Sequence, residues 1–382
     1  MARPKTGKRK EGAPSLLWQD DGGNQITQVD ILKGFAIIAV ILIHTFSSNL
    51  LTVIGAPYYL WQAVPVFLLL AAFTGALSYH RLGKGSLLHC YDPVVLFKRF
   101  RRILVPFFII GIIQVIVILW VWPSSLTLYS DNCMLVYSGI SGIIGFFASG
   151  ITGPGNYFVP LVLTQILVLP FLYWLAVRSS PDKMLVIAFI ADVVLQYALY
   201  LANMPAVTSA FSYLNYLFLA ALGIWLALRQ RTQVAYVIAA GLISAAYITA
   251  VYYFKFQFWF ISPSSGFFTE FGYFWTLVLI VYGLRHLPAS PLSRSFGAIA
   301  KLGRASWHIF LVQMTVIAFF SYVMILFLRG VIPGTGMPEI LTRQAINTVL
   351  TLAICLPLGY GFYLAEEELN RRVQRVTGSR EK

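Results

Sequence analysis

Apolar runs of about 20 residues recur along this chain, and they constrain its fold more than any other feature. A helix of that length covers the hydrocarbon core of a bilayer. Only helices and closed barrels satisfy their backbone polar groups there. Of the 382 residues, 58% are hydrophobic and only 11% are charged, whereas soluble proteins carry about 25% charged residues. The sequence therefore predicts an all-α, polytopic transmembrane helical bundle.

Ten spanning helices can be delimited from these runs. They are expected at 30–53, 58–80, 102–122, 156–177, 184–202, 207–228, 235–254, 267–285, 306–328 and 341–365. The apolar segment 137–150 is short and rich in Gly, so we expect a re-entrant or interfacial element whose backbone is covered by protein. Residues 1–27 are expected to form a disordered basic cytoplasmic tail, 28–365 the transmembrane domain, and 366–382 a polar cytoplasmic tail.

Loop charges predict the orientation of the bundle. If the N-terminus is cytoplasmic, 24 of the 28 Lys and Arg residues fall in the inner segments and three in the outer loops. That asymmetry follows the positive-inside rule and predicts that both termini are cytoplasmic. The same rule accounts for the net charge of +14, so no nucleic-acid partner is expected. Neither the three cysteines nor the five histidines have the spacing of a disulfide framework or a metal site.

The first run carries three polar groups, Asp30, Lys33 and His44. Lys33 and His44 are about three helical turns apart and lie on nearly the same face. The rise between them is roughly 16 Å, about half of a typical hydrocarbon core. Ionisable groups at such depth are rare and indicate function. We therefore expect a polar track inside the bundle, with His44 near the middle of the membrane.

A basic cluster from Lys98 to Arg102 leads into the third run. In the simpler interpretation, the cluster only anchors the helix on the inner side of the membrane, as the positive-inside rule predicts. The alternative is an anion site. Arg99 and Arg102 are three positions apart, so they share one face of a helix, and guanidinium groups match phosphate oxygens in a bidentate manner.

Other polar residues in apolar surroundings are open to two interpretations. Tyr157 is an interfacial aromatic or lines an outward-facing acceptor site, and Gln165 bonds a neighbouring helix in the simplest case. Glu270 is interpreted as an interfacial charge, with a second acid or base as the alternative. Asp192 needs a partner that the sequence does not name. His308 is expected near the cytoplasmic surface as a solvated or structural residue.

Four motifs in order resemble the acyltransferase-3 family of integral-membrane acyltransferases, over roughly residues 28–365. They are Asp30, Lys33 and His44 in the first helix, Pro65-Val66-Phe67 in the second, Arg99 and Arg102 before Pro106, and the string from Gly303 to Leu311. The chain departs from the family pattern in three places. It has Ala71-Ala72 where Ser-Gly is frequent, Gln313 where His is frequent, and Lys33 where Arg is frequent.

The resemblance implies O-acyl transfer, commonly O-acetylation, as in polysaccharide modification. The acyl group would move from acyl-CoA, with acetyl-CoA as co-substrate and no bound cofactor or metal, to a hydroxyl of a sugar, glycan or lipid-linked carbohydrate. His44 would act as general base or transient acyl carrier. Lys33, Arg99 and Arg102 would bind the CoA phosphates. Supporting or acceptor-side roles would fall to Asp30, Tyr157, Gln165 and Glu270.

Two other functions are compatible with such a chain. A transporter or flippase for a lipid-linked glycan would also have a polar track, although the halves show no repeat and no matched pair of broken helices. A structural membrane protein would tolerate replacement of the polar residues in the first helix. The plasma membrane is the simplest location, in contact with membrane lipid. The acceptor, the acyl chain, the order of the chemical steps and the oligomeric state stay open.

Overall fold

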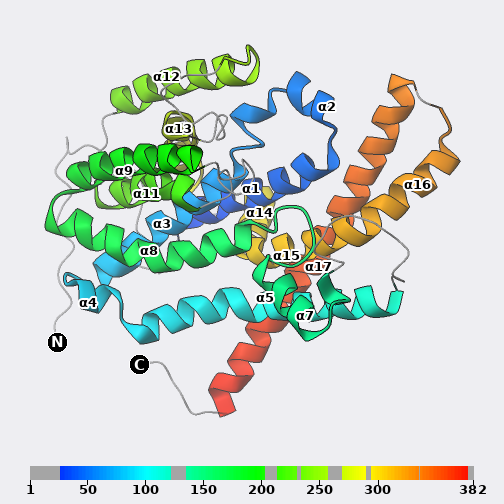
Figure 1. Ribbon diagram of the computed structural model, residues 1–382, viewed down its shortest axis with the longest axis horizontal. Helices are drawn as coiled ribbons and strands as arrows, with labels where there is room; N and C mark the ends of the chain where they lie inside the picture. Colours follow the sequence, from blue (N-terminus) through cyan, green and yellow to red (C-terminus); the bar gives the residue numbers. More distant parts are fainter. Residues whose placement is uncertain are drawn as a thin grey trace.

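The computed structural model describes residues 26–121, 135–202, 213–229, 234–256, 269–289, 294–334 and 336–376. Nearly all of the expected N-terminal tail 1–27, and residues 377–382 of the expected C-terminal tail, lie outside these residues. The described part is helical and contains no strand (Figure 1). The predicted all-α fold is confirmed for it.

The helices of the first half are α1 (Thr27–Thr45), α2 (Ser48–Val53), η1 (Ala56–Tyr58), α3 (Ala63–Arg81), α4 (Leu87–Cys90), α5 (Pro93–Val121), α7 (Ile140–Ala148) and α8 (Phe158–Arg178). Those of the second half are α9 (Pro181–Leu201), η2 (Tyr213–Tyr216), α11 (Leu217–Leu228), α12 (Val234–Tyr252), α13 (Glu270–His286), α14 (Arg294–Arg304), α15 (Ser306–Val316), η3 (Ile317–Ser321), α16 (Tyr322–Val331) and α17 (Met337–Val376).

Six helices in the described part are long and apolar enough to cross a membrane, or seven if the bent pair of α14 with α15 counts as one span. Three further predicted spans coincide at least in part with α9, α11 and α13. Of these, α11 has 12 residues and α13 has 17, fewer than the ~20 that a perpendicular span needs. The count of ten and the cytoplasmic position of the termini therefore stay predictions.

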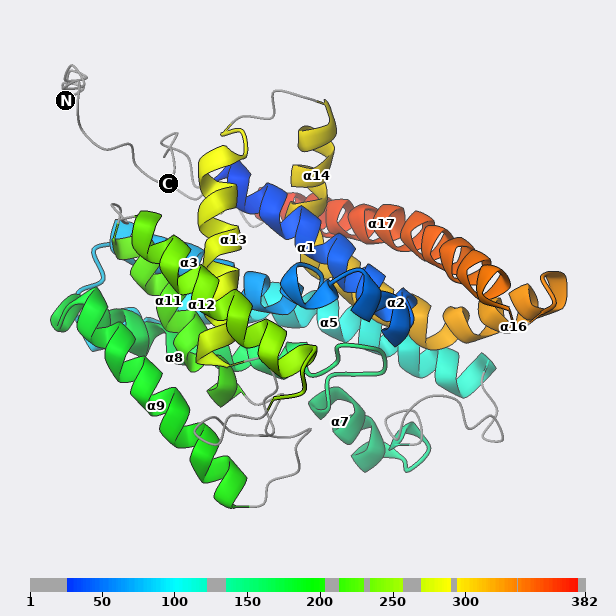
Figure 2. The ribbon, with the colours of Figure 1, turned by 90° about the horizontal axis from the view of Figure 1, so that it is seen from above.

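Helix α1 lies at the centre of the fold, in contact with α3, α13, α14, α15 and α17 (Figure 2). The expected helix 30–53 was too long, because α1 ends at Thr45 and the chain turns at Phe46. The hydroxyl of Ser47 then accepts a hydrogen bond from the N–H of Leu50 and caps the short helix α2. An N-cap serine of this kind begins a new helix.

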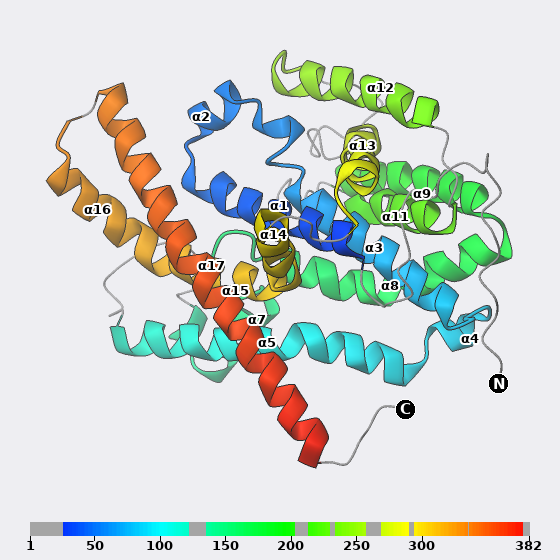
Figure 3. The same ribbon diagram turned by 180° about the vertical axis from the view of Figure 1, so that it is seen from behind.

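Near the C-terminal end of the chain, a second predicted helix is also interrupted. The predicted span 306–328 consists of α15, the π-helical turn η3 and α16. At its start the chain bends by 73° between α14 and α15. In Figure 3, α14 lies in front of α1 and beside α17, and both of these helices contact it. This bend brings Arg304, the last residue of α14, to the first turns of α1.

Glycines allow several of these helices to approach closely. A Cβ added at Gly303 would lie 1.7 Å from the carbonyl oxygen of Asp30, and one at Gly34 would lie 2.2 Å from that of Ile299. No side chain fits at either distance, so α14 and α1 touch through their backbones. Small residues have this role in membrane helix packing, where close van der Waals contact replaces the hydrophobic effect as the driving force.

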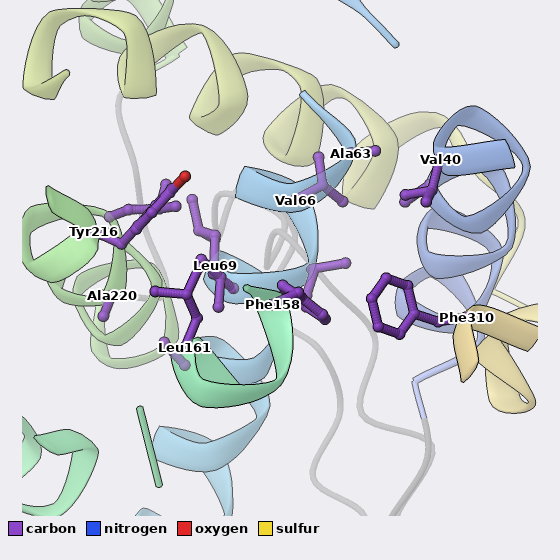
Figure 4. Packing of buried hydrophobic residues seen from close by; sticks show 14 of the residues in the cluster. Val40, Ala63, Val66, Leu69, Phe158, Leu161, Tyr216, Ala220 and Phe310 are labelled. Carbon is purple, nitrogen blue, oxygen red and sulfur yellow. The ribbon is translucent and has the colours of Figure 1, made fainter. Parts of the chain in front are cut away.

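The apolar core joins both halves of the molecule. Figure 4 shows a row of side chains that runs from Tyr216 past Leu69 and Phe158 to Phe310 and Val40. These residues come from η2, α3, α8, α15 and α1 in turn. The expected short element at 137–150 is the nine-residue helix α7, and its Phe147 packs against the rings of α5.

Candidate active site

His44 lies in the last turn of α1, at the end of the helix rather than in the middle of a longer one. The loop before α8 covers it. A Cβ added at Gly155 would lie 3.9 Å from His44 Nε2 and 3.2 Å from the ring of Phe310. The backbone of this loop therefore lies against the imidazole, and the ring has a protein surface beside it.

A group of charges gathers at the opposite end of α1. The Asp30 carboxylate interacts electrostatically with three cations, which are Lys33 of the same helix, Arg102 of α5 and Arg304 of α14. Lys33 is partly buried, whereas the two arginines are exposed. None of these three cations forms a hydrogen bond or ion pair within the described residues. We call Lys33, Arg102 and Arg304 the cationic cluster.

Arg99 does not take the position expected from its spacing to Arg102. Its Nη1 donates a hydrogen bond of 3.0 Å to the hydroxyl of Tyr79, and its guanidinium lies 4.3 Å from the centre of the Tyr79 ring. Arg99 is thus held on α3, whereas Arg102 interacts electrostatically with Asp30 of α1 and Tyr363 of α17. The two side chains are neighbours on α5 with different contacts.

The stretch of α1 between the two ends is apolar. Lys33 and His44 are separated by roughly 16 Å along the helix axis. On the face between them lie Ile37, Val40 and Ile41, all at most 3% exposed. A polar track was expected here, and the contribution of α1 to this face is hydrophobic instead. The imidazole and the cations are two separate polar groups at opposite ends of one helix.

The comparison with known proteins decides the class of the molecule. A family model described as an acyltransferase domain matches residues 26–362, which include both ends of α1, the loop at Gly155 and the cationic cluster. The chain belongs to the acyltransferase-3 family. No curated protein and no solved structure matches it. The acyltransferase is a membrane protein with several apolar helices, so the resemblance of its sequence motifs is confirmed.

Two residues that were expected near the acceptor have different surroundings in this acyltransferase. Gln165 donates a hydrogen bond of 2.7 Å to the carbonyl of Leu68 on α3, which agrees with a packing role. Tyr157 immediately precedes α8, and its N–H donates to the Oδ1 of Asn156. Tyr157 therefore belongs to the loop that covers His44, whereas Gln165 holds two helices together.

Glu270 is not the interfacial charge that the sequence suggested, because its side chain is 1% exposed. Its Oε1 accepts a hydrogen bond of 3.1 Å from Gln196. Asp192 is fully buried nearby and repels it electrostatically, while Asp192 Oδ2 accepts the N–H of Phe218 at the start of α11. These contacts join α9, α11 and α13 and include none of the residues around His44.

His308 is buried, which agrees with the structural one of its two expected roles. It contacts the Glu366 carboxylate and packs against the rings of Phe362 and Tyr363, so it links α15 to α17. Among the described residues, no group of three or more His, Cys, Asp or Glu side chains has the arrangement of a metal site.

Sequence reasoning missed two residues of the acyltransferase. Arg304 stands in the string from Gly303 to Leu311 that indicated the family, but its sequence position does not place it beside Lys33. Gln114 is a lone polar residue in an apolar run. It makes three hydrogen bonds, to Thr152 and Thr315. A buried amide in such a run is the signal that identifies it.

Proposed function

We propose that this acyltransferase moves an acyl group, commonly acetyl, from acyl-CoA to a hydroxyl of a sugar, glycan or lipid-linked carbohydrate. The observation that carries the proposal is the division of α1 into two polar ends. One end has a cationic cluster, and the other has an imidazole beside a glycine-rich loop. Phosphates and a thioester are likewise the two ends of an acyl-CoA molecule.

The cationic cluster suits the phosphates of CoA. Three cations converge from three helices and make no ion pair within the described part. Charge-assisted hydrogen bonds to phosphate are among the strongest in proteins. Arg99, on Tyr79, lies one turn away and supports the same end of the site.

His44 suits the chemical step. An imidazole is the usual general base for a hydroxyl nucleophile. Its Nε2 takes the hydroxyl proton while the hydroxyl oxygen attacks the thioester carbon. The carbon–sulfur bond then breaks, and the proton passes to the CoA thiolate. In the alternative order, His44 first carries the acyl group itself. Both routes need the imidazole at this position.

The acceptor is proposed to arrive at the end of α1 that carries the loop. Loop charges place the segment before Tyr157 on the outer side and the segments of Arg102 and Arg304 on the inner side. Acyl-CoA would then enter from the cytoplasm of a cell whose plasma membrane holds the enzyme, and the modified sugar would leave outside. Asn156 and Tyr157 directly follow Gly155 in the sequence, and we propose that their polar side chains contact the acceptor.

Replacement of His44 tests the proposal. Membranes that contain His44→Ala are expected to transfer radiolabelled acetyl from acetyl-CoA at least about 100-fold more slowly than the wild type, since a general base contributes on the order of 10²–10⁴-fold. His286→Ala is the matched control, because His286 is an exposed residue of α13 whose ring lies at a tilted angle against Tyr282. Full activity of the His44 variant would remove His44 from the mechanism.

A further inference from the structure

The loop over His44 has an unusual backbone. Ile151 has a φ of 62°, and Gly150, Gly153 and Gly155 have φ values of 91°, 136° and 88°. A positive φ is rare for a β-branched residue and costs on the order of 1–3 kcal/mol. The three glycines adopt such φ values without this cost, so the strain lies at Ile151, whose conformation persists only where its surroundings hold it. Strained backbone of this kind tends to gather at active sites.

Gln114 of α5 is the residue that holds this loop. Its side chain is fully buried. Its Oε1 accepts the N–H of Thr152 at 3.0 Å, and its Nε2 donates to the carbonyl of Thr152 at 2.9 Å and to the hydroxyl of Thr315 at 3.0 Å. The amide thus pairs with both backbone groups of one loop residue and with α15. A second glutamine, Gln313, donates to the carbonyl of Pro154 at 3.3 Å.

The loop so held brings one free donor close to the imidazole. The N–H of Gly155 makes no hydrogen bond with the described residues. The amide nitrogen is roughly 2.5 Å from the position of an added Cβ, and that position is 3.9 Å from His44 Nε2. The nitrogen therefore lies at most about 6.4 Å from Nε2. A base and an oxyanion donor that serve the same carbonyl group are separated by a similar distance.

Resting on the proposed function, we propose that the Gly155 N–H is the donor to the thioester carbonyl oxygen during acyl transfer, and that Gln114 is its positioning residue. When the acceptor oxygen attacks the carbonyl carbon, the C=O electron pair moves onto oxygen. The Gly155 N–H stabilises that negative charge. The pair returns as the carbon–sulfur bond breaks, and the hydroxyl proton leaves through His44 to the thiolate. Glycine suits this position because a φ of 88° is strained for a residue with a side chain, and an added Cβ would lie 3.2 Å from the Phe310 ring.

The first test replaces Gln114 in the full-length enzyme. Initial rates of [14C]acetyl transfer from acetyl-CoA to the endogenous acceptor of membrane vesicles give an apparent kcat and a KM for acetyl-CoA. Gln114→Leu removes all three hydrogen bonds at nearly constant volume. We expect kcat to fall on the order of 10²–10³-fold, the loss seen when one oxyanion donor is removed. The KM is expected to stay unchanged, because the phosphates bind at the other end of α1.

Gln62→Leu is the matched control. Gln62 is also a buried glutamine, and it joins the backbone carbonyl of Pro57 in η1 to the hydroxyl of Thr276. Its loss disturbs packing to a similar degree without touching the loop over His44. We therefore expect kcat close to wild type. Equal losses of kcat in the Gln62 and Gln114 variants would show a general packing effect and overturn the proposal.

A glycine pair keeps the proposal testable if the Gln114 variant does not fold. Gly155→Ala and Gly139→Ala both place alanine at a positive φ, but an added Cβ at Gly139 meets nothing within 4 Å. Only the Gly155 variant is expected to lose kcat with an unchanged KM. Wild-type kcat in folded Gly155→Ala would overturn the oxyanion assignment. If His44→Ala were still inactive, the proposed function would stand. Activity of His44→Ala would overturn that function as well.

Discussion

Three arginines near the start of α1 illustrate how differently one residue type is used in this enzyme. Arg99 rests on Tyr79, with both a hydrogen bond and a stacked ring. Arg102 and Arg304 make no such contact within the described part and interact at longer range with Asp30 and Tyr363. A side chain without a protein partner is available to a ligand. We therefore propose that Arg102 and Arg304 contribute more than Arg99 to the proposed binding of CoA.

Removal of either arginine is expected to weaken acyl-CoA binding. A hydrogen bond to a charged group contributes about 1.5–3 kcal/mol, so Arg102→Ala and Arg304→Ala should each raise the KM for acetyl-CoA about 10- to 100-fold, with kcat little changed. Steady-state rates in membrane vesicles give both constants. Arg178→Ala is the control, because Arg178 is an exposed arginine that lies over Trp174. A wild-type KM in both cluster variants would leave these arginines with a topological role only.

At the scale of helices, backbone contact through glycine is the main device of the fold. Gly34 and Gly303 let α14 rest on α1, and Gly223 lets α11 rest on α3, where an added Cβ would lie 2.4 Å from the carbonyl oxygen of Leu69. The same device joins α15 to α17 at Gly359. This contact matters for the site, since α15 carries Phe310 and Gln313, which lie against the loop over His44.

Two glycines of α17 allow the effect of helix packing on stability to be distinguished from the effect of helix propensity. A Cβ at Gly359 would lie 2.5 Å from the Cα of Ile309, whereas one at Gly361 meets nothing within 4 Å. Gly359→Ala is expected to destabilise the protein by about 1–3 kcal/mol through overpacking. Gly361→Ala should be neutral or stabilising by up to about 1 kcal/mol. Thermal unfolding of the two purified variants in detergent measures the difference. Equal melting temperatures would contradict the close approach of α15 and α17.

At the scale of the whole molecule, the arrangement of the loops matches the direction in which the chemistry is proposed to run. The segments that carry Arg102 and Arg304 are both predicted from their charge to be inner, and the structure brings these two arginines to the same end of α1. The segment that ends at Gly155 is predicted to be outer by the same rule, and Gly155 lies near His44 at the other end. The donor and the acceptor would therefore meet the enzyme from opposite sides.

Sealed vesicles of known orientation test this arrangement. Acetyl-CoA does not cross a sealed bilayer, so label added outside should reach the enzyme only in inside-out vesicles, where the cytoplasmic face is exposed. Right-side-out vesicles should gain equal activity after permeabilisation with detergent. Measurement of [14C]acetyl in the membrane fraction gives the ratio. Equal rates in both orientations before permeabilisation would contradict the predicted sidedness.

Composition and local spacing determined the class of this protein. Apolar runs predict helices because a helix satisfies its own backbone groups in lipid, and the described part of the chain is helical. The order of Asp30, Lys33 and His44, with the later motifs, indicated the acyltransferase-3 family that the family model confirms. These features are readable because each depends on residues within a few turns of one another, or on the order of motifs along the chain.

Tertiary structure alone decided which distant residues meet. Hydropathy could not show that Glu270 is buried, because its burial depends on neighbours far along the chain such as Gln196. The approach of Gly155 to His44 and of Arg304 to Asp30 spans more than a hundred residues in each case. The periodic pattern of apolar residues in a helix carries no information about contacts between residues so far apart in the sequence. They follow from how glycine-lined helices pack, and that packing is a property of the assembled bundle.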